Sequence, residues 1–174
     1  MAEGKLTVLL ISLLCVCAPI SLAQSGSTGH VMAPPNMIDG STNPSSISDK
    51  AAHRLFYIAV GASDSASSDE KGRRDAHLRK IGLNDNDRIA VAAALTAFKN
   101  KFQAFMNSWN AAAEAALAKN QPFDPTPFLK QRDALVQSTR MTLTSLLTPE
   151  GSALLFQHIT AEKKKMRVDA LEAQ

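Results

Sequence analysis

The sequence predicts an all-α fold of four to five helices: a long antiparallel helical hairpin, a flanking C-terminal helix and a disordered N-terminal arm. Apolar residues recur with the period of an α-helix over long segments that lack Gly and Pro. Residues that can cap a helix, namely Ser, Thr or Asn, precede these segments. No segment alternates apolar and polar residues over the length of a strand, so we expect essentially no sheet.

Residues 1–23 are predicted to form a secretory signal peptide. Lys5 supplies a positive start, the apolar run Leu6–Val16 follows, and small residues at Ser21 and Ala23 suit cleavage before residue 24. The alternative, a membrane anchor, is disfavoured because this run is about half of the roughly 20 apolar residues that span a bilayer. We therefore expect a periplasmic or secreted bacterial protein without stable membrane insertion.

Both cysteines, Cys15 and Cys17, lie inside this segment. After cleavage the chain can form neither a disulfide nor a thiolate metal site, and it has no cysteine nucleophile. A lipoprotein acylated at one of these cysteines is a further alternative. The residues before them, Leu14 and Val16, are larger than the small residue that such processing prefers.

The rest of the chain is predicted to divide into a flexible arm, residues 24–47, and a helical domain, residues 48–174. The arm is rich in Ser, Gly, Pro and Asn, and it has too little apolar surface to offset the entropy cost of ordering. His30, Met32 and Met37 on the arm could bind a soft metal, although a simple spacer explains them as well.

Two helices are predicted to open the helical domain. Ser48 or Asp49 can cap the first, whose apolar residues fall between Ala51 and Ala59. The second helix, Asp69–Ile81, is strongly charged, and Gly82 ends it.

The segment from Leu83 to Gln121 contains neither Gly nor Pro and predicts one long helix. Asn84 is placed to cap it by accepting a hydrogen bond from the amide of Asp87. Large apolar residues follow at alternating steps of four and three, which average the 3.6-residue period of an α-helix: Val91, Leu95, Phe98, Phe102, Phe105 and Trp109. This aromatic stripe is either core or the wall of a ligand groove.

Two more helices complete the predicted fold. A proline-containing turn at Asp124–Pro127 precedes the helix Phe128–Leu147, and the short connection favours an antiparallel pair with the preceding helix. Thr148, Pro149 and Glu150 then combine a cap, a first-position proline and a first-turn acid. The last helix is expected to present four apolar residues on one face: Leu154, Leu155, Ile159 and Met166.

The sequence offers little for catalysis. The segment Gly61-Ala62-Ser63-Asp64-Ser65 fits a nucleophile elbow except at its last position, where glycine is required, and no strand is predicted before it. Neither a phosphate-cradling glycine-rich loop nor a dinucleotide fingerprint occurs in the sequence. We therefore expect no enzymatic activity and no cofactor.

His158 and Glu162 are the candidate metal ligands. They are four residues apart on a predicted helix, so both point to one side. A closed zinc site needs four ligands, and the other histidines of the domain, His53 and His77, are far away in the sequence. The alternative is an exposed histidine beside a solvated glutamate.

The charge pattern excludes one class of partner and suggests another. A net charge of +3, from 19 basic and 16 acidic residues, is too mild to predict nucleic-acid binding. Basic residues gather at Arg73, Arg74, Arg79 and Lys80, and again at Lys163–Arg167. These clusters are either solvated faces or surfaces that attract acidic partners.

Two predicted helix starts carry a family resemblance. Ile81–Arg88 opens the long helix and Leu146–Gly151 opens the last one, with Phe123-Asp124 between them. This arrangement resembles the Spy/CpxP-like periplasmic proteins, which carry a Leu-Thr-x-x-Gln signature at two such places and a Phe-Asp break between the helices. The chain departs from the signature at three positions: Asn84 replaces Thr, and Asp87 and Gly151 replace Gln.

The resemblance covers roughly Ile81 to Met166, and it implies a small helical cradle, often a homodimer, that acts without ATP. Family members bind unfolded clients, modulate envelope stress sensing or bind metal through His-rich or Cys-rich tails, which this chain lacks. By analogy, the client-binding candidates are basic and aromatic residues of the hairpin: Arg88, Lys99, Lys101, Phe102, Phe105, Lys130, Arg132 and Arg140.

We therefore expect an exported chaperone-like or envelope-stress adaptor protein that binds unfolded or acidic protein clients. Two alternatives remain. One is a periplasmic metal-binding or metal-resistance protein that uses His158 and Glu162. The other is a structural envelope protein with a dedicated partner.

Overall fold

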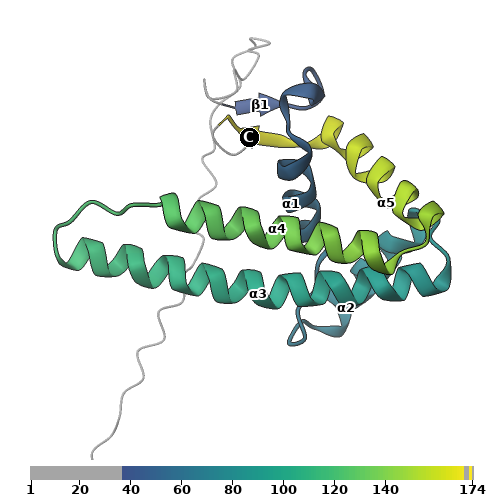
Figure 1. Ribbon diagram of the computed structural model, residues 1–174, viewed down its shortest axis with the longest axis horizontal. Helices are drawn as coiled ribbons and strands as arrows, with labels where there is room; N and C mark the ends of the chain where they lie inside the picture. The colour runs from purple at the N-terminus through teal and green to yellow at the C-terminus, as the bar shows by residue number, and fades with distance from the viewer. Residues whose placement is uncertain (1–36, 171–172, 174) are drawn as a thin grey trace, which may run out of the picture. The chain divides into compact units, whose positions relative to one another are not determined.

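The computed structural model describes residues 37–170 and Ala173, and these form a mostly helical fold with one small pair of strands (Figure 1). The predicted all-α class is confirmed, with five α-helices within the described residues: α1 (Asp49–Val60), α2 (Ser68–Lys80), α3 (Asp85–Ala118), α4 (Thr126–Leu146) and α5 (Pro149–Glu162). The predicted signal peptide and the arm up to Asn36 lie outside the described residues. None of the helices in the described part is long and apolar enough to cross a membrane.

The predicted helix starts are confirmed by their capping bonds. A polar side chain accepts a hydrogen bond from the amide three residues later in each case, at 3.1 Å from Ala51 to Ser48, 2.8 Å from Asp87 to Asn84 and 3.0 Å from Gly151 to Thr148. Such caps satisfy amides that the first turn of a helix leaves unpaired.

The second helix is bounded as its sequence indicates. Ser67 and Glu70 form a capping box, in which each side chain bonds the other residue's backbone amide. After the helix, Gly82 has a φ of 85°, a left-handed conformation that favours glycine. This conformation stops α2 and lets the chain turn into α3.

The predicted antiparallel hairpin is formed by α3 and α4, which run side by side in opposite directions (Figure 1). Asn120, with a φ of 51°, follows α3 and turns the chain toward α4. Asp124 then accepts a hydrogen bond from the amide of Thr126 at 2.9 Å, at the first residue of α4. The long hairpin supplies the surface on which α1 packs, and α5 packs mainly against α1.

The core lies where α1, α3, α4 and α5 meet. Large side chains that are almost completely buried come from all four helices: Tyr57, Leu95, Phe98, Val136, Leu143, Leu155 and Ile159. Each large apolar side chain removed from water in this way contributes about 1.5–3 kcal/mol. The aromatic stripe of α3 enters this core at Phe98, whose ring centroid lies 5.2 Å from that of Tyr57.

A buried carboxylate joins the two helix starts that carry the family resemblance. Asp87, in the first turn of α3, accepts hydrogen bonds from the amide of Thr148 at 2.9 Å and from its hydroxyl at 2.6 Å. Asn84 donates a third bond to it at 2.7 Å. The bonds from Thr148 and Asn84 hold the pKa of Asp87 below its ordinary value, because they favour the charged form. Asp87 therefore fixes the start of α5 against the start of α3.

The prediction of essentially no sheet is wrong at one place. Met37–Asp39 forms strand β1, which pairs antiparallel with strand β2, Arg167–Asp169, with Ile38 opposite Val168. Part of the predicted flexible arm is therefore ordered. Its Ile38 packs against the core and Ile47 is fully buried, so this stretch has apolar anchors despite its polar composition.

The close approach of Gly40 to the C-terminal segment explains where the paired strands end. Its amide donates to the carbonyl of Met166 at 2.9 Å. A Cβ atom at this position would lie 1.8 Å from the carbonyl oxygen of Lys163, so only glycine allows the two segments to meet.

The last helix is also shorter than predicted. It ends at Glu162, a 3₁₀ turn covers Lys163–Lys165, and Met166 lies outside the helical face on which it was placed. The cause is tertiary: the Lys163 ammonium turns inward and bonds Asp49 at the start of α1 at 2.7 Å. Lys163 is 9% exposed, so this basic cluster is not a uniformly solvated face.

Candidate functional site

An apolar cavity of about 460 Å³ lies beside the core, where α1, α3, α4 and β2 meet. It is lined by apolar side chains of α1, α3 and β2 together with three arginines and an aspartate: Arg54, Leu55, Ile58, Phe102, Phe105, Met106, Trp109, Arg132, Arg167, Val168 and Asp169. The combination of an apolar lining and several cations is the chemical signature of this cavity.

The aromatic stripe of α3 builds one wall of the cavity. Phe98 is fully buried in the core, whereas Phe102 and Trp109 are only half-buried. The rings still form a continuous series, with Phe98 stacked on Phe102 at 5.6 Å and Phe105 against Trp109 at 6.0 Å between centroids. The first residues of the stripe therefore belong to the core, and its later residues form the cavity wall. Each of the two interpretations of the stripe thus applies to one part of it.

The arginines are held around this wall by different elements. Arg54 of α1 is buried, Arg132 of α4 has a side chain 12% exposed, and Arg167 of β2 has one 75% exposed. Arg167 pairs with Asp39 of β1 at 3.3 Å, so the small sheet positions one cation of the cavity.

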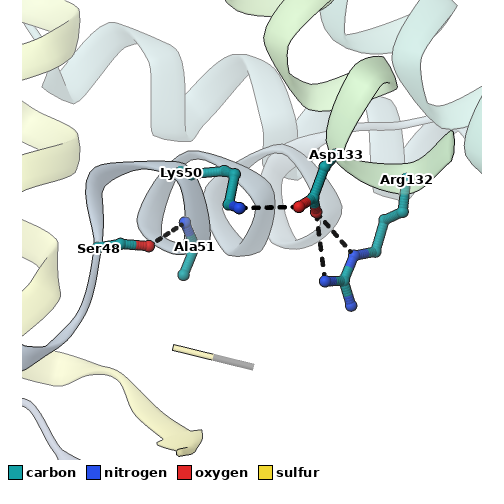
Figure 2. A network of polar contacts seen from close by, with 5 residues as sticks. All are labelled: Ser48, Lys50, Ala51, Arg132 and Asp133. Atoms are coloured by element: carbon teal, nitrogen blue, oxygen red, sulfur yellow. Dashed lines mark hydrogen bonds and ion pairs between the residues drawn. The ribbon is translucent and has the colours of Figure 1, made fainter. Parts of the chain in front are cut away.

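Asp133 fixes Arg132 and links α4 to α1. Figure 2 shows its carboxylate between Lys50 of α1, at 2.8 Å, and Arg132, at 3.3 Å. In the same view the Ser48 hydroxyl caps the start of α1 at the amide of Ala51. Partial burial raises the pKa of Asp133, but the bond and charge of Lys50 outweigh this and leave it below its ordinary value. The charged carboxylate holds the Arg132 guanidinium beside the cavity.

Three of the eight predicted client-binding residues meet at the cavity, namely Phe102, Phe105 and Arg132. Lys101 and Lys130 are exposed outside it.

The remaining three predicted residues have structural contacts elsewhere. Arg88 pairs with Asp85 in the first turn of α3 at 2.8 Å. Lys99 donates to the carbonyl of Ile58 at 2.9 Å and so closes the end of α1. The guanidinium of Arg140 lies 5.5 Å from the ring centroid of Phe156, a cation–π contact. The eight residues therefore do not form one continuous face.

Sequence reasoning missed the contribution of α1 and β2. Arg54 stands among the apolar positions of α1, and a charged residue on an otherwise buried helix face was a signal that could have been used. Arg167 and Val168 gave no such signal, because their place depends on pairing with β1, more than a hundred residues earlier.

The candidate metal ligands have different neighbours from those expected. Glu162 accepts a hydrogen bond from Lys165 at 2.6 Å. His158 instead meets His77 of α2, with 3.2 Å between the two Nε2 atoms. Burial and then the neighbouring His158 lower the pKa of His77. Within the described residues, no three metal-binding side chains gather at one point.

The fold and the cavity define an all-α protein with an arginine-rich, aromatic-lined cavity. The chain matches no protein-family model, no curated protein and no solved structure. The similarity to the Spy/CpxP-like proteins thus rests on the two helix starts in the sequence alone.

Proposed function

We propose that this chain is an exported, ATP-independent chaperone-like or envelope-stress adaptor protein, and that it binds unfolded or acidic protein clients at the cavity. The observation that supports the proposal is the meeting of Phe102, Trp109 and three arginines around one cavity. An apolar side chain flanked by carboxylates fits this lining. Export rests on the predicted signal peptide of residues 1–23.

The cavity alone is too small to explain firm binding. Burying one large apolar side chain contributes about 1.5–3 kcal/mol, less than the 4.1 kcal/mol that corresponds to a millimolar dissociation constant. Pairing of client carboxylates with Arg132 and Arg167 is therefore needed to add affinity. Such transient binding suits a protein that holds unfolded chains without an energy source.

Arg167 and Arg132 have different roles in attracting and binding acidic segments of a client. The exposed Arg167 side chain attracts acidic segments from a distance, and salt screens this attraction over about 10 Å at 0.1 M. The less exposed Arg132 guanidinium, held by Asp133, is placed to form a directed bond with a carboxylate next to the apolar wall.

The test is suppression of the aggregation of an unfolded client, followed by light scattering without ATP. The full chain is compared with Arg132→Gln and with Lys101→Gln, a matched control that removes one positive charge outside the cavity. We expect suppression by the wild type at near-stoichiometric ratio, a clear loss in Arg132→Gln and little change in Lys101→Gln. Suppression should also weaken as salt rises.

Two results would overturn the proposal. One is no suppression with several clients. The other is equal suppression by the wild type and by the double variant Phe102→Ala/Arg132→Gln, which would show that any chaperone activity lies elsewhere on the surface.

A further inference from the structure

Two imidazoles from helices far apart in the sequence face each other across a partly buried contact. His77 lies in the last turn of α2 and His158 in α5, with their Nε2 atoms 3.2 Å apart. The main packing partners of α2 are α3 and α1, and the main helical partner of α5 is α1. The histidine pair is thus a direct connection between two elements that share little packing.

The separation of the two nitrogens matches that of two ligands on one metal ion. With zinc–nitrogen bonds of about 2.0–2.1 Å, nitrogens at 3.2 Å subtend an angle of about 100–106° at the metal, close to tetrahedral. Imidazole suits zinc, copper and nickel among the divalent ions. Rotation of the two rings would direct both lone pairs at a common ion.

The surroundings orient the pair and keep one carboxylate close to it. Phe56 of α1 lies against both rings, with centroids 5.7 Å from His77 and 5.9 Å from His158. Glu162 stands one turn after His158 on α5 and is near enough to affect His77 electrostatically. The cations nearby are Lys80 and Lys165, which are both exposed, and the Lys165 ammonium pairs with Glu162 at 2.6 Å.

We propose that His77 and His158 form a binding site for one divalent transition-metal ion, which joins α2 to α5. The protein supplies two imidazole ligands, and water or a ligand from solution completes the coordination. This site is separate from the cavity, because neither histidine lines it. A test of this metal site is therefore independent of any test of client binding at the cavity.

The first experiment is a Zn²⁺ titration of the full chain in competition with a chromophoric chelator. We expect one Zn²⁺ per chain, and more than about tenfold weaker binding in His77→Gln and in His158→Gln. Glutamine keeps a hydrogen-bonding side chain but is a poor zinc ligand. His30→Gln is the control for uptake by a lone histidine outside the described residues, and it should bind like the wild type.

The second experiment measures thermal unfolding with and without Zn²⁺. Because a ligand that binds only the folded state stabilises it, Zn²⁺ should raise the melting temperature of the wild type and of His30→Gln but not of the two site variants. Unfolding without metal shows whether each variant folds. If neither does, visible absorption of Co²⁺ added to the wild-type chain decides, since tetrahedral Co²⁺ bound to imidazole absorbs far more strongly than the aqueous ion.

The proposal is overturned if the wild type shows no saturable Zn²⁺ uptake and no Co²⁺ absorption. It is equally overturned if both site variants fold and retain wild-type affinity. Either result would leave the two histidines as a hydrogen-bonded pair alone.

Discussion

Replacing Gly151 by alanine tests whether Asp87 locks the start of α5 to α3. A Cβ atom at Gly151 would lie 2.1 Å from Oδ2 and 2.6 Å from Cγ of Asp87. The carboxylate would have to retreat by about 1 Å or more to reach ordinary contact. It cannot do so without lengthening its bonds from Thr148 and Asn84, which are 2.6–2.9 Å long.

The magnitude follows from two opposing effects. Glycine to alanine inside a helix normally stabilises a protein by about 0.5–1 kcal/mol, because glycine loses more conformational entropy on folding. Forcing an extra methyl group into a packed site normally costs about 1–3 kcal/mol. We therefore expect Gly151→Ala to lower the free energy of unfolding by up to about 2.5 kcal/mol, and not to raise it.

The chain offers a matched control in Gly72 of α2. A Cβ atom there would meet nothing within 4 Å, so Gly72→Ala should stabilise the protein by about 0.5–1 kcal/mol. Urea unfolding followed by circular dichroism gives both values. Replacing Asp87 by alanine removes the obstructing carboxylate, so Gly151→Ala should cost less in that background than in the wild type. Equal stabilisation by Gly72→Ala and Gly151→Ala would refute the reasoning.

Three further predictions concern other contacts. The pKa of Asp87 is lowered by folding, so its contribution to stability is present above the unfolded value of 3.8 and is lost as pH falls through the folded value. Urea midpoints from about pH 6 down to about pH 3 should therefore fall less steeply in Asp87→Asn, and parallel curves would contradict this. Leu155→Ala removes a fully buried side chain and should lower the free energy of unfolding by about 2–5 kcal/mol. Trp109→Ala should lower it by less, because Trp109 is only half-buried. A larger loss for Trp109→Ala would place this residue in the core. Gly40→Ala should release β1 from β2, seen as faster amide exchange at Val168; unchanged exchange would show that the backbone adapts.

The helix boundaries could be predicted because their chemistry is local. Ser48, Asn84 and Thr148 each cap a helix through an amide three residues away, and the residues that take part stand together in the sequence. The stripe on α3 is likewise local, since the period of the helix alone brings its rings to one face. These features were correct in both type and position.

The features that could not be predicted depend on distant partners. Strand β1 forms within a polar arm because it pairs with β2, which lies more than a hundred residues later in the chain. Helix α5 ends early because Lys163 forms an ion pair with Asp49. The sequence pairs His158 with Glu162 as candidate metal ligands, whereas in the structure His158 lies against His77 of α2. The period and the caps of each helix can be predicted from a single sequence. The distant side chains that contact each helix cannot be predicted in this way.

The cavity lies along the aromatic stripe of α3, between two sets of ring contacts. Because α1 crosses the hairpin and does not run along it, it covers only part of α3 (Figure 1). Tyr57 of α1 therefore reaches Phe98, while Phe123 and Phe128, at the other end of the hairpin, reach Trp109 with centroids 5.3 and 5.5 Å away. Between these two contacts lie Phe102 and Phe105, which line the cavity together with Leu55 and Ile58 of α1. One regular apolar repeat thus contributes to the core at Phe98 and to the cavity wall at Phe102 and Trp109, which is why sequence periodicity alone could not separate the two.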